Sequence, residues 1–76
     1  MKVDVDLDAV GLNCPLPLLK LKQKINSMPV GQVIRVLTSD RGSVRDFSAF
    51  VKQAGHTMLE SSEGTDTFLF IIRKEV

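Results

Sequence analysis

The stretch VDVDLDAVGLNCPLPLLKLKQKINSMP, residues 3–29, decides the fold of this 76-residue chain. Apolar residues alternate with three aspartates over residues 3–9, which is the period of a strand with one face buried and one in water. Apolar residues then recur at spacings of three and four between residues 18 and 28. This pattern predicts a helix over about residues 15–27, which the proline and glycine that follow bring to an end.

A second strand and helix follow the first pair. Residues 32–38 are rich in Val, Ile and Leu, which is typical of a buried central strand. Residues 43–55 carry a second apolar helical stripe that ends at a glycine. Ser43 stands three residues before Asp46, and this spacing predicts a capping box at the start of the second helix.

Two further strands complete the order βαβαββ. We expect them over residues 57–61 and 67–74, joined by the polar turn 63–66. A helix after each of the first two strands implies right-handed crossovers and parallel neighbouring strands. The sequence thus predicts an α+β fold, a two-layer α/β sandwich with a four-stranded mixed sheet and two helices on one face. We expect residues 1–76 to form a single domain.

The composition excludes several classes of protein. Hydrophobic residues make up 43% of the chain and charged residues 25%, which excludes disorder. The net charge of +1 is too small for a domain that mainly binds nucleic acid, so we expect no direct nucleic-acid partner. The chain has no apolar run of about 20 residues, no signal-peptide core and no possible internal disulfide. We therefore expect a cytoplasmic protein, a monomer, with no membrane partner.

Cys14 is the only cysteine, and it begins the run CPLP at the expected helix start. A thiol there faces unpaired backbone N–H groups and the positive end of the helix dipole, both of which favour the thiolate. Pro15 suits the first helical position, and Pro17 removes a second N–H donor, so the first turn should be stiff. We interpret Cys14 as an accessible, activated thiol; the alternative is a small buried hydrophobe.

The strand order also predicts what surrounds the sulfur. If the first two strands are parallel, the loops 11–14 and 39–43 leave the sheet at the same end. Asp40, Arg41 and Ser43 would then be neighbours of Cys14. Basic residues also concentrate between residues 20 and 52, and they indicate either a surface for a protein partner or simply solvated helix faces. They are Lys20, Lys22, Lys24, Arg35, Arg41, Arg45 and Lys52.

Other kinds of chemistry find little support in the sequence. His56 has no triad signature around it, so we interpret it as a turn residue rather than a base for Cys14. One cysteine and one histidine cannot supply the usual three or four nitrogen or sulfur ligands, so we expect no metal unless a site forms between molecules. We also expect no cofactor. A thiolate without a second cysteine or an evident base can accept a group, hold it and pass it on, which fits persulfide sulfur.

The segment LDAVGLNCPLP, residues 7–17, closely resembles the signature Leu-Asp-x-x-Gly-x-x-Cys-Pro-x-Pro of the TusA-like (SirA-like) sulfur-carrier family. The resemblance extends over nearly the whole chain and implies the family's two-layer βαβαββ sandwich. It also implies a sulfurtransferase-type carrier. Cys14 would accept sulfane sulfur as a persulfide from a cysteine desulfurase or rhodanese-like donor and transfer it to a downstream acceptor protein.

In such a carrier Gly11, Pro15 and Pro17 support the cysteine motif. The resemblance and the charge pattern together indicate candidate partner contacts at Lys20, Lys22, Asp40, Arg41 and Arg45. Relatives serve tRNA thiolation, sulfur oxidation or molybdenum cofactor maturation, and the sequence does not choose among these pathways. The alternative function is a non-catalytic protein-interaction or regulatory module.

Overall fold

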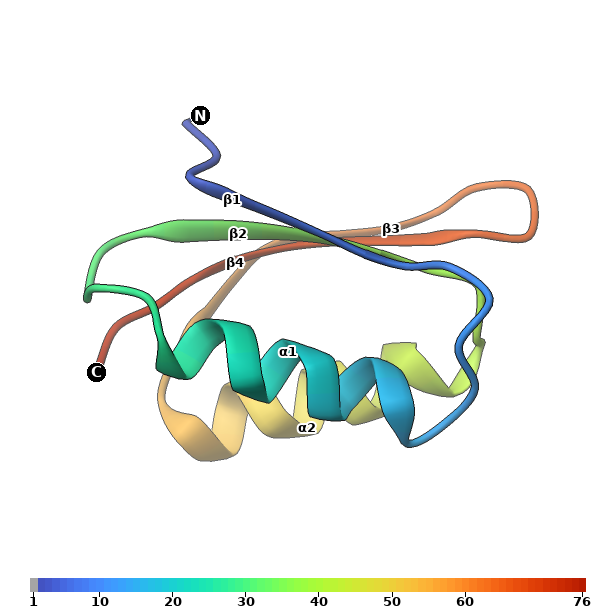
Figure 1. Ribbon diagram of the computed structural model, residues 1–76, viewed down its shortest axis with the longest axis horizontal. Coiled ribbons are helices and arrows are strands. Elements are labelled where there is room, and N and C mark those ends of the chain that lie inside the picture. The colour runs from blue at the N-terminus through green and yellow to red at the C-terminus, as the bar shows by residue number, and fades with distance from the viewer. Residues whose placement is uncertain (1) are drawn as a thin grey trace.

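A computed structural model describes residues 2–76, which form a layer of four strands and a layer of two helices (Figure 1). Both helices lie against the same face of the sheet. The predicted α+β sandwich and its element order are therefore confirmed. The elements are β1 (Val5–Ala9), α1 (Leu16–Asn26), β2 (Val33–Thr38), α2 (Gly42–Ala54), β3 (Thr57–Glu63) and β4 (Phe68–Arg73).

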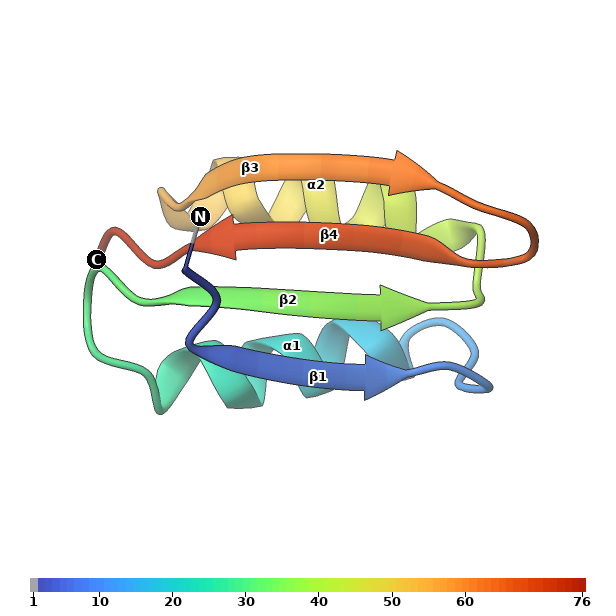
Figure 2. The ribbon, with the colours of Figure 1, turned by 90° about the horizontal axis from the view of Figure 1, so that it is seen from above.

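The strands lie in the order β1-β2-β4-β3 (Figure 2). β1 and β2 are parallel neighbours, in register from Val5 opposite Ile34 to Ala9 opposite Thr38. β2 and β3 also run parallel, but they are not neighbours as the sequence predicts. β4 lies between them and is antiparallel to both. The apolar run of β4 explains this position, since a central strand is the most completely buried place in the sheet.

The core fills the space between the sheet and the helices. Phe47 of α2 and Phe70 of β4 are fully buried, and their ring centroids are 4.6 Å apart. Each such side chain contributes about 1.5–3 kcal/mol through burial. The buried cluster consists of Leu21, Ile25, Met28, Ile34, Val36, Phe47, Val51, Phe68, Phe70 and Ile72. The two helices are thereby held with their N-termini at the end of the sheet where β1 and β2 finish (Figures 1 and 2).

The predicted capping box at the start of α2 is wrong. α2 begins at Gly42, so Ser43 is already helical, and its buried hydroxyl has no hydrogen-bond partner among the described residues. Arg41 occupies the N-cap position without a side-chain cap. Asp46 is therefore free to contact another part of the chain. At the other end, Gly55 ends the helix in a left-handed conformation, as the sequence predicts.

The remaining element boundaries differ from the expected ones by a few residues. β3 extends two residues beyond the predicted strand, to Glu63, and contains a bulge between Met58 and Glu60. α1 begins one residue after Pro15, which occupies the N-cap position, and the Cys14–Pro15 peptide bond is cis. These shifts leave the order and the layers unchanged.

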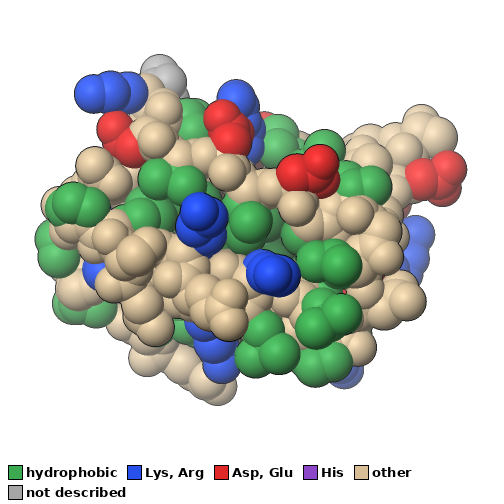
Figure 3. Space-filling model, in the orientation of Figure 1, with side chains coloured by type: hydrophobic (Ala, Val, Ile, Leu, Met, Phe, Trp, Pro, Cys, Tyr) green, Lys and Arg blue, Asp and Glu red, His purple; other side chains and the backbone are tan. Residues whose placement is uncertain are grey.

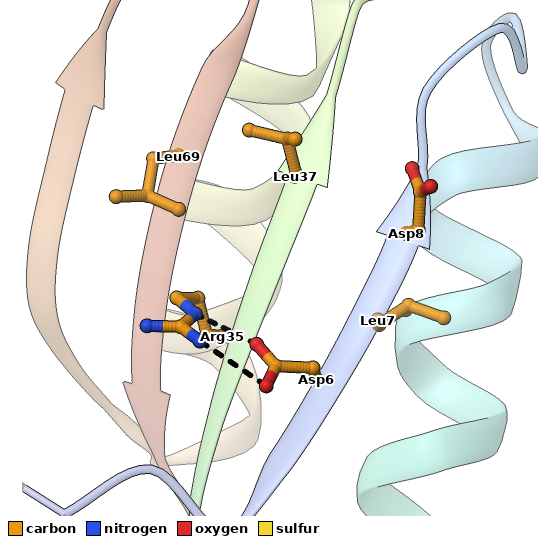
Figure 4. A pocket seen from close by; sticks show the side chains of 6 residues that line it. All are labelled: Asp6, Leu7, Asp8, Arg35, Leu37 and Leu69. Atoms are coloured by element: carbon orange, nitrogen blue, oxygen red, sulfur yellow. Dashed lines mark hydrogen bonds and ion pairs between the residues drawn. The ribbon is translucent and has the colours of Figure 1, made fainter.

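No other element of residues 2–76 covers the sheet face opposite the helices. It carries a shallow hollow lined by Leu37, Leu69 and a bidentate ion pair between Arg35 and Asp6 (Figure 4). Cys14 does not line this hollow. Among residues 2–76, no helix has both the length and the apolar character needed to cross a membrane.

Candidate functional site

The loop that carries Cys14 begins with a tight turn at the end of β1. The Leu12 amide donates to the Ala9 carbonyl at 3.3 Å, and Gly11 has a φ of +88° in the third position of this turn. A positive φ at that position is easily adopted by glycine and strained for other residues. The Gly11 amide donates to Ser39 Oγ at 2.8 Å, which ties the loop to the end of β2. The positive φ of Gly11 therefore gives a geometric reason for a glycine at this position of the cysteine motif.

Cys14 lies between two carboxylates, one from the loop after β2 and one from α2. Its backbone amide donates to Asp40 Oδ2 at 3.0 Å, and Asp40 follows β2 directly. Its Sγ donates to Asp46 Oδ2 at 3.3 Å, and Asp46 lies in α2. The thiol itself is exposed and free. The loop is thus fixed at its backbone while the sulfur remains reachable from outside.

These contacts reverse one expectation. The sequence predicts an activated Cys14 whose thiolate is favoured, but the pKa of the thiol is raised above its ordinary value. The hydrogen bond to Asp46 is the largest cause; desolvation and the negative charges of Asp46 and Asp40 add to it. Only Arg45 acts in the opposite direction. The accessible position of Cys14 agrees with the prediction, whereas its ionisation does not.

Two amides at the helix start donate to backbone carbonyls rather than to the sulfur. The Leu16 amide donates to the Asn13 carbonyl at 2.8 Å, and the Leu19 amide donates to the Pro15 carbonyl at 3.1 Å. Pro15 and Pro17 have no N–H to offer. No hydrogen bond joins a helix-start amide to Sγ among the described residues, so the Asp46 carboxylate in hydrogen-bond contact decides which form of the thiol is favoured.

The predicted neighbours of the sulfur behave differently from one another. Asp40 contacts Cys14 as expected. Arg41 turns towards the β3–β4 hairpin, where its guanidinium lies 3.5 Å from Glu63 and 5.6 Å from the centre of the Phe68 ring. Ser43 is buried. Of these three residues, only Asp40 has a hydrogen bond to the cysteine.

Sequence reasoning missed Asp46 as the partner of the thiol. The capping-box pattern assigned its carboxylate to the helix backbone, and that assignment concealed it. One signal was available: Asp46 directly precedes Phe47, so it borders the apolar stripe that α2 packs into the core.

The surface around Cys14 combines apolar and basic side chains. Four large apolar residues near the starts of the two helices are exposed by 40–46%, namely Val10, Leu16, Leu19 and Val44. Figure 3 shows hydrophobic side chains gathered over the first turns of α1, with basic side chains beside them. Lys22 Nζ lies 5.6 Å from the centre of the Phe50 ring, and Arg45 Nε lies 3.8 Å from Asp46 Oδ1. Lys20 lines a shallow hollow along α1.

His56 lies at the opposite end of the sheet from the thiol. It precedes Thr57, which pairs with Arg73 at the end of the sheet where β2 begins, whereas the Cys14 loop follows the end where β2 finishes. Its Nδ1 accepts a hydrogen bond from the Glu75 amide at 3.1 Å. His56 therefore has no part in the Cys14 site, in agreement with its interpretation as a turn residue. Within residues 2–76, no cluster of three potential metal ligands occurs.

Comparison with known families identifies this arrangement. The family model described as sulfurtransferase TusA matches residues 5–74, which include every helix and strand and the whole cysteine loop. The chain belongs to the TusA family. The family resemblance of the CPLP segment is thereby confirmed.

Curated TusA relatives match over most of their length. The chain is 52% identical over 71 residues to a sulfur carrier protein TusA from Allochromatium vinosum, with 93% of both chains covered. It is 39% identical over 75 residues to a TusA from Pseudomonas syringae, covering 99% of this chain and 89% of that protein. The crystal structure of a SirA-like protein from Desulfitobacterium hafniense shares the TusA fold, with a TM-score of 0.81 at 20% identity, covering 96% of this chain and 100% of that one.

Proposed function

We propose that this sulfur carrier takes up sulfane sulfur on Cys14 as a persulfide and passes it to an acceptor protein. The observation that carries the proposal is the exposed Cys14 Sγ on a loop whose backbone is fixed through Asp40. Cys14 is also the only cysteine of the chain, so no other thiol is available to bind sulfur. Family membership favours this role over a non-catalytic interaction module.

The transfer is a thiol–persulfide exchange in each direction. During loading, the Cys14 sulfur attacks the outer sulfur of a donor persulfide, the donor S–S bond breaks, and the donor's inner sulfur leaves with the electron pair and takes up a proton. The products are Cys14–S–SH and the donor thiol, with no net oxidation. During delivery, an acceptor thiolate attacks the outer sulfur, the S–S bond to Cys14 breaks, and Cys14 leaves with the electron pair and takes up the proton that the acceptor thiol lost. Because the chain has no second cysteine, no internal thiol can attack the persulfide and convert it to a disulfide.

The donor in this proposal is a cysteine desulfurase or a rhodanese-like protein, and the acceptor is a downstream protein of a sulfur relay. Lys20, Lys22 and Arg45 are candidate contacts to acidic groups on these partners, beside the exposed apolar residues at the helix starts. Arg41 is also exposed but already faces Glu63, so we assign it a weaker role. Asp40 would act mainly by holding the loop in place.

Mass spectrometry tests the persulfide directly. Incubation with a cysteine desulfurase and cysteine should add the mass of one sulfur atom to the intact protein, and a reductant should remove it. Cys14→Ser should show no gain, and Met58→Leu, a volume-conserving control elsewhere in the fold, should load like the wild type. A wild-type protein that stays unmodified with several donors would refute persulfide carriage on Cys14.

A complementation assay separates carriage from a purely structural role. A folded Cys14→Ser variant should fail to restore the function of a deletion strain, because it lacks the atom that binds sulfur. Full complementation by this variant would favour the interaction module. We also propose that the chain acts as a single-domain cytoplasmic monomer, which sedimentation of the purified protein and cell fractionation can check.

A further inference from the structure

Asp46 is the group best placed to control the Cys14 proton. Its Oδ2 accepts the thiol hydrogen bond at 3.3 Å, and its side chain is only 20% exposed. A carboxylate that accepts a hydrogen bond from a thiol favours the protonated, poorly nucleophilic form. Asp40 adds negative charge from the β2–α2 loop, and Arg45 of α2 provides the opposing positive charge. The unloaded site is therefore arranged to retain the proton.

We propose that Asp46 holds the proton of the Cys14 thiol in the free carrier, and that a cationic group of the docked sulfur donor releases it. This inference rests on the proposed persulfide function of Cys14. Asp46 acts through Cys14 and is a positioning residue. It slows the reaction of the unloaded carrier with oxidants and small electrophiles until a donor is bound.

The geometry brings a docked donor close to Asp46. Reacting atoms in a productive complex lie about 3–3.5 Å apart, so the donor's outer sulfur approaches Cys14 Sγ to about that distance. Because Sγ and Asp46 Oδ2 are themselves 3.3 Å apart, the donor's outer sulfur comes within about 7 Å of the carboxylate oxygen from any direction of approach. A positive charge placed there weakens the carboxylate's attraction for the thiol proton. The Cys14 thiolate then attacks as in the exchange described above, and the released proton ends on the donor's departing sulfur.

Alkylation by neutral iodoacetamide over a range of pH tests the first half of the proposal. Asp46→Asn keeps the shape of the side chain but removes its charge. The pH profile of the alkylation rate of this variant should therefore shift to lower pH, and the rate at neutral pH should rise. Arg45→Gln should shift the profile to higher pH, because it removes the only opposing charge. Asp66→Asn, a control in the β3–β4 turn, should match the wild type. An Asp46→Asn profile that coincides with the wild type or moves to higher pH overturns the proposal.

Thermal unfolding of each variant shows whether a shifted profile comes from a folded protein. If Asp46→Asn fails to fold, the Arg45→Gln profile decides, and the absence of its shift to higher pH counts against the proposal. A merely structural role of Asp46 would change the melting temperature without moving the pH profile.

Loading from a cysteine desulfurase at neutral pH tests the second half. If the docked donor already neutralises Asp46, Asp46→Asn should accelerate donor loading by a smaller factor than it accelerates alkylation. Equal factors would show that the donor does not relieve Asp46 and would overturn this half. Failure of the wild type to load from several donors would refute the persulfide function alone, and the alkylation profiles would still decide whether Asp46 holds the proton.

Discussion

The two turns that contain Gly11 and Gly31 provide a matched pair for separating loop geometry from overall stability. Each glycine occupies the third position of a turn closed by a 3.3 Å hydrogen bond, from Leu12 to Ala9 and from Gln32 to Pro29. Their φ angles are +88° and +94°, and a Cβ added at either position would meet no atom within 4 Å. Substitution by alanine therefore tests the backbone conformation alone.

We predict a similar loss of stability for Gly11→Ala and Gly31→Ala. A non-glycine residue with left-handed φ costs about 1–2 kcal/mol, and the reduced entropy of the unfolded chain offsets about 0.4–1 kcal/mol of this. The net loss is about 1 kcal/mol, or roughly 4–8 °C in Tm for a domain of this size. A 76-residue domain has roughly 4–11 kcal/mol of stability, so both variants should still fold.

The two variants should differ at the cysteine. The Gly11 amide donates to Ser39 Oγ in the loop that leads to Cys14, whereas the Gly31 amide donates to the Lys74 carbonyl at the other end of the sheet. Strain at Gly11 should therefore change the pH profile of Cys14 alkylation and slow sulfur loading, while Gly31→Ala should leave both unchanged. Equal effects of the two variants on Cys14 would refute the reasoning, because reactivity would then follow overall stability rather than loop geometry. Unchanged unfolding of Gly11→Ala would refute the backbone argument.

Two further substitutions test the loop anchor and a titrating contact. Asp40→Ala removes the acceptor of the Cys14 amide and should cost about 1 kcal/mol in urea unfolding, with sulfur loading slowed; Asp40→Asn, which retains an acceptor oxygen, should restore most of both. The pKa of His56 is lowered, chiefly by desolvation and then by the charge of Lys74, so the unfolded chain binds a proton more readily than the fold does. The stability from neutral His56 is present above its unfolded pKa of about 6.5 and is lost as the pH falls through the lower folded pKa. The Tm of His56→Gln should therefore fall less than the Tm of the wild type between about pH 7 and pH 5. Equal falls would show that His56 does not cause the loss of stability at low pH.

The elements of the fold and the pairing of β1 with β2 follow from the sequence pattern, but the position of β4 in the sheet does not. Alternation over residues 3–9 and the helical stripe between residues 18 and 28 predict β1 and α1 because each pattern depends on one segment and its exposed and buried faces. The insertion of β4 between β2 and β3 depends on which strand buries most apolar surface in the assembled sheet. The bulge in β3 likewise arises from its pairing with β4.

The sequence by itself determined that Cys14 is the only thiol, that a turn and two prolines present it at a helix start, and that the loop after β2 lies beside it. These properties depend on residue type and on the parallel order of β1 and β2. Only the tertiary structure decided the ionisation of the thiol. The pKa of Cys14 depends on the charged atoms within a few ångströms, and the packing of α2 beside the cysteine loop places the Asp46 carboxylate there. The partial charges of a helix start are a local property of the chain, and a full negative charge in hydrogen-bond contact outweighs them.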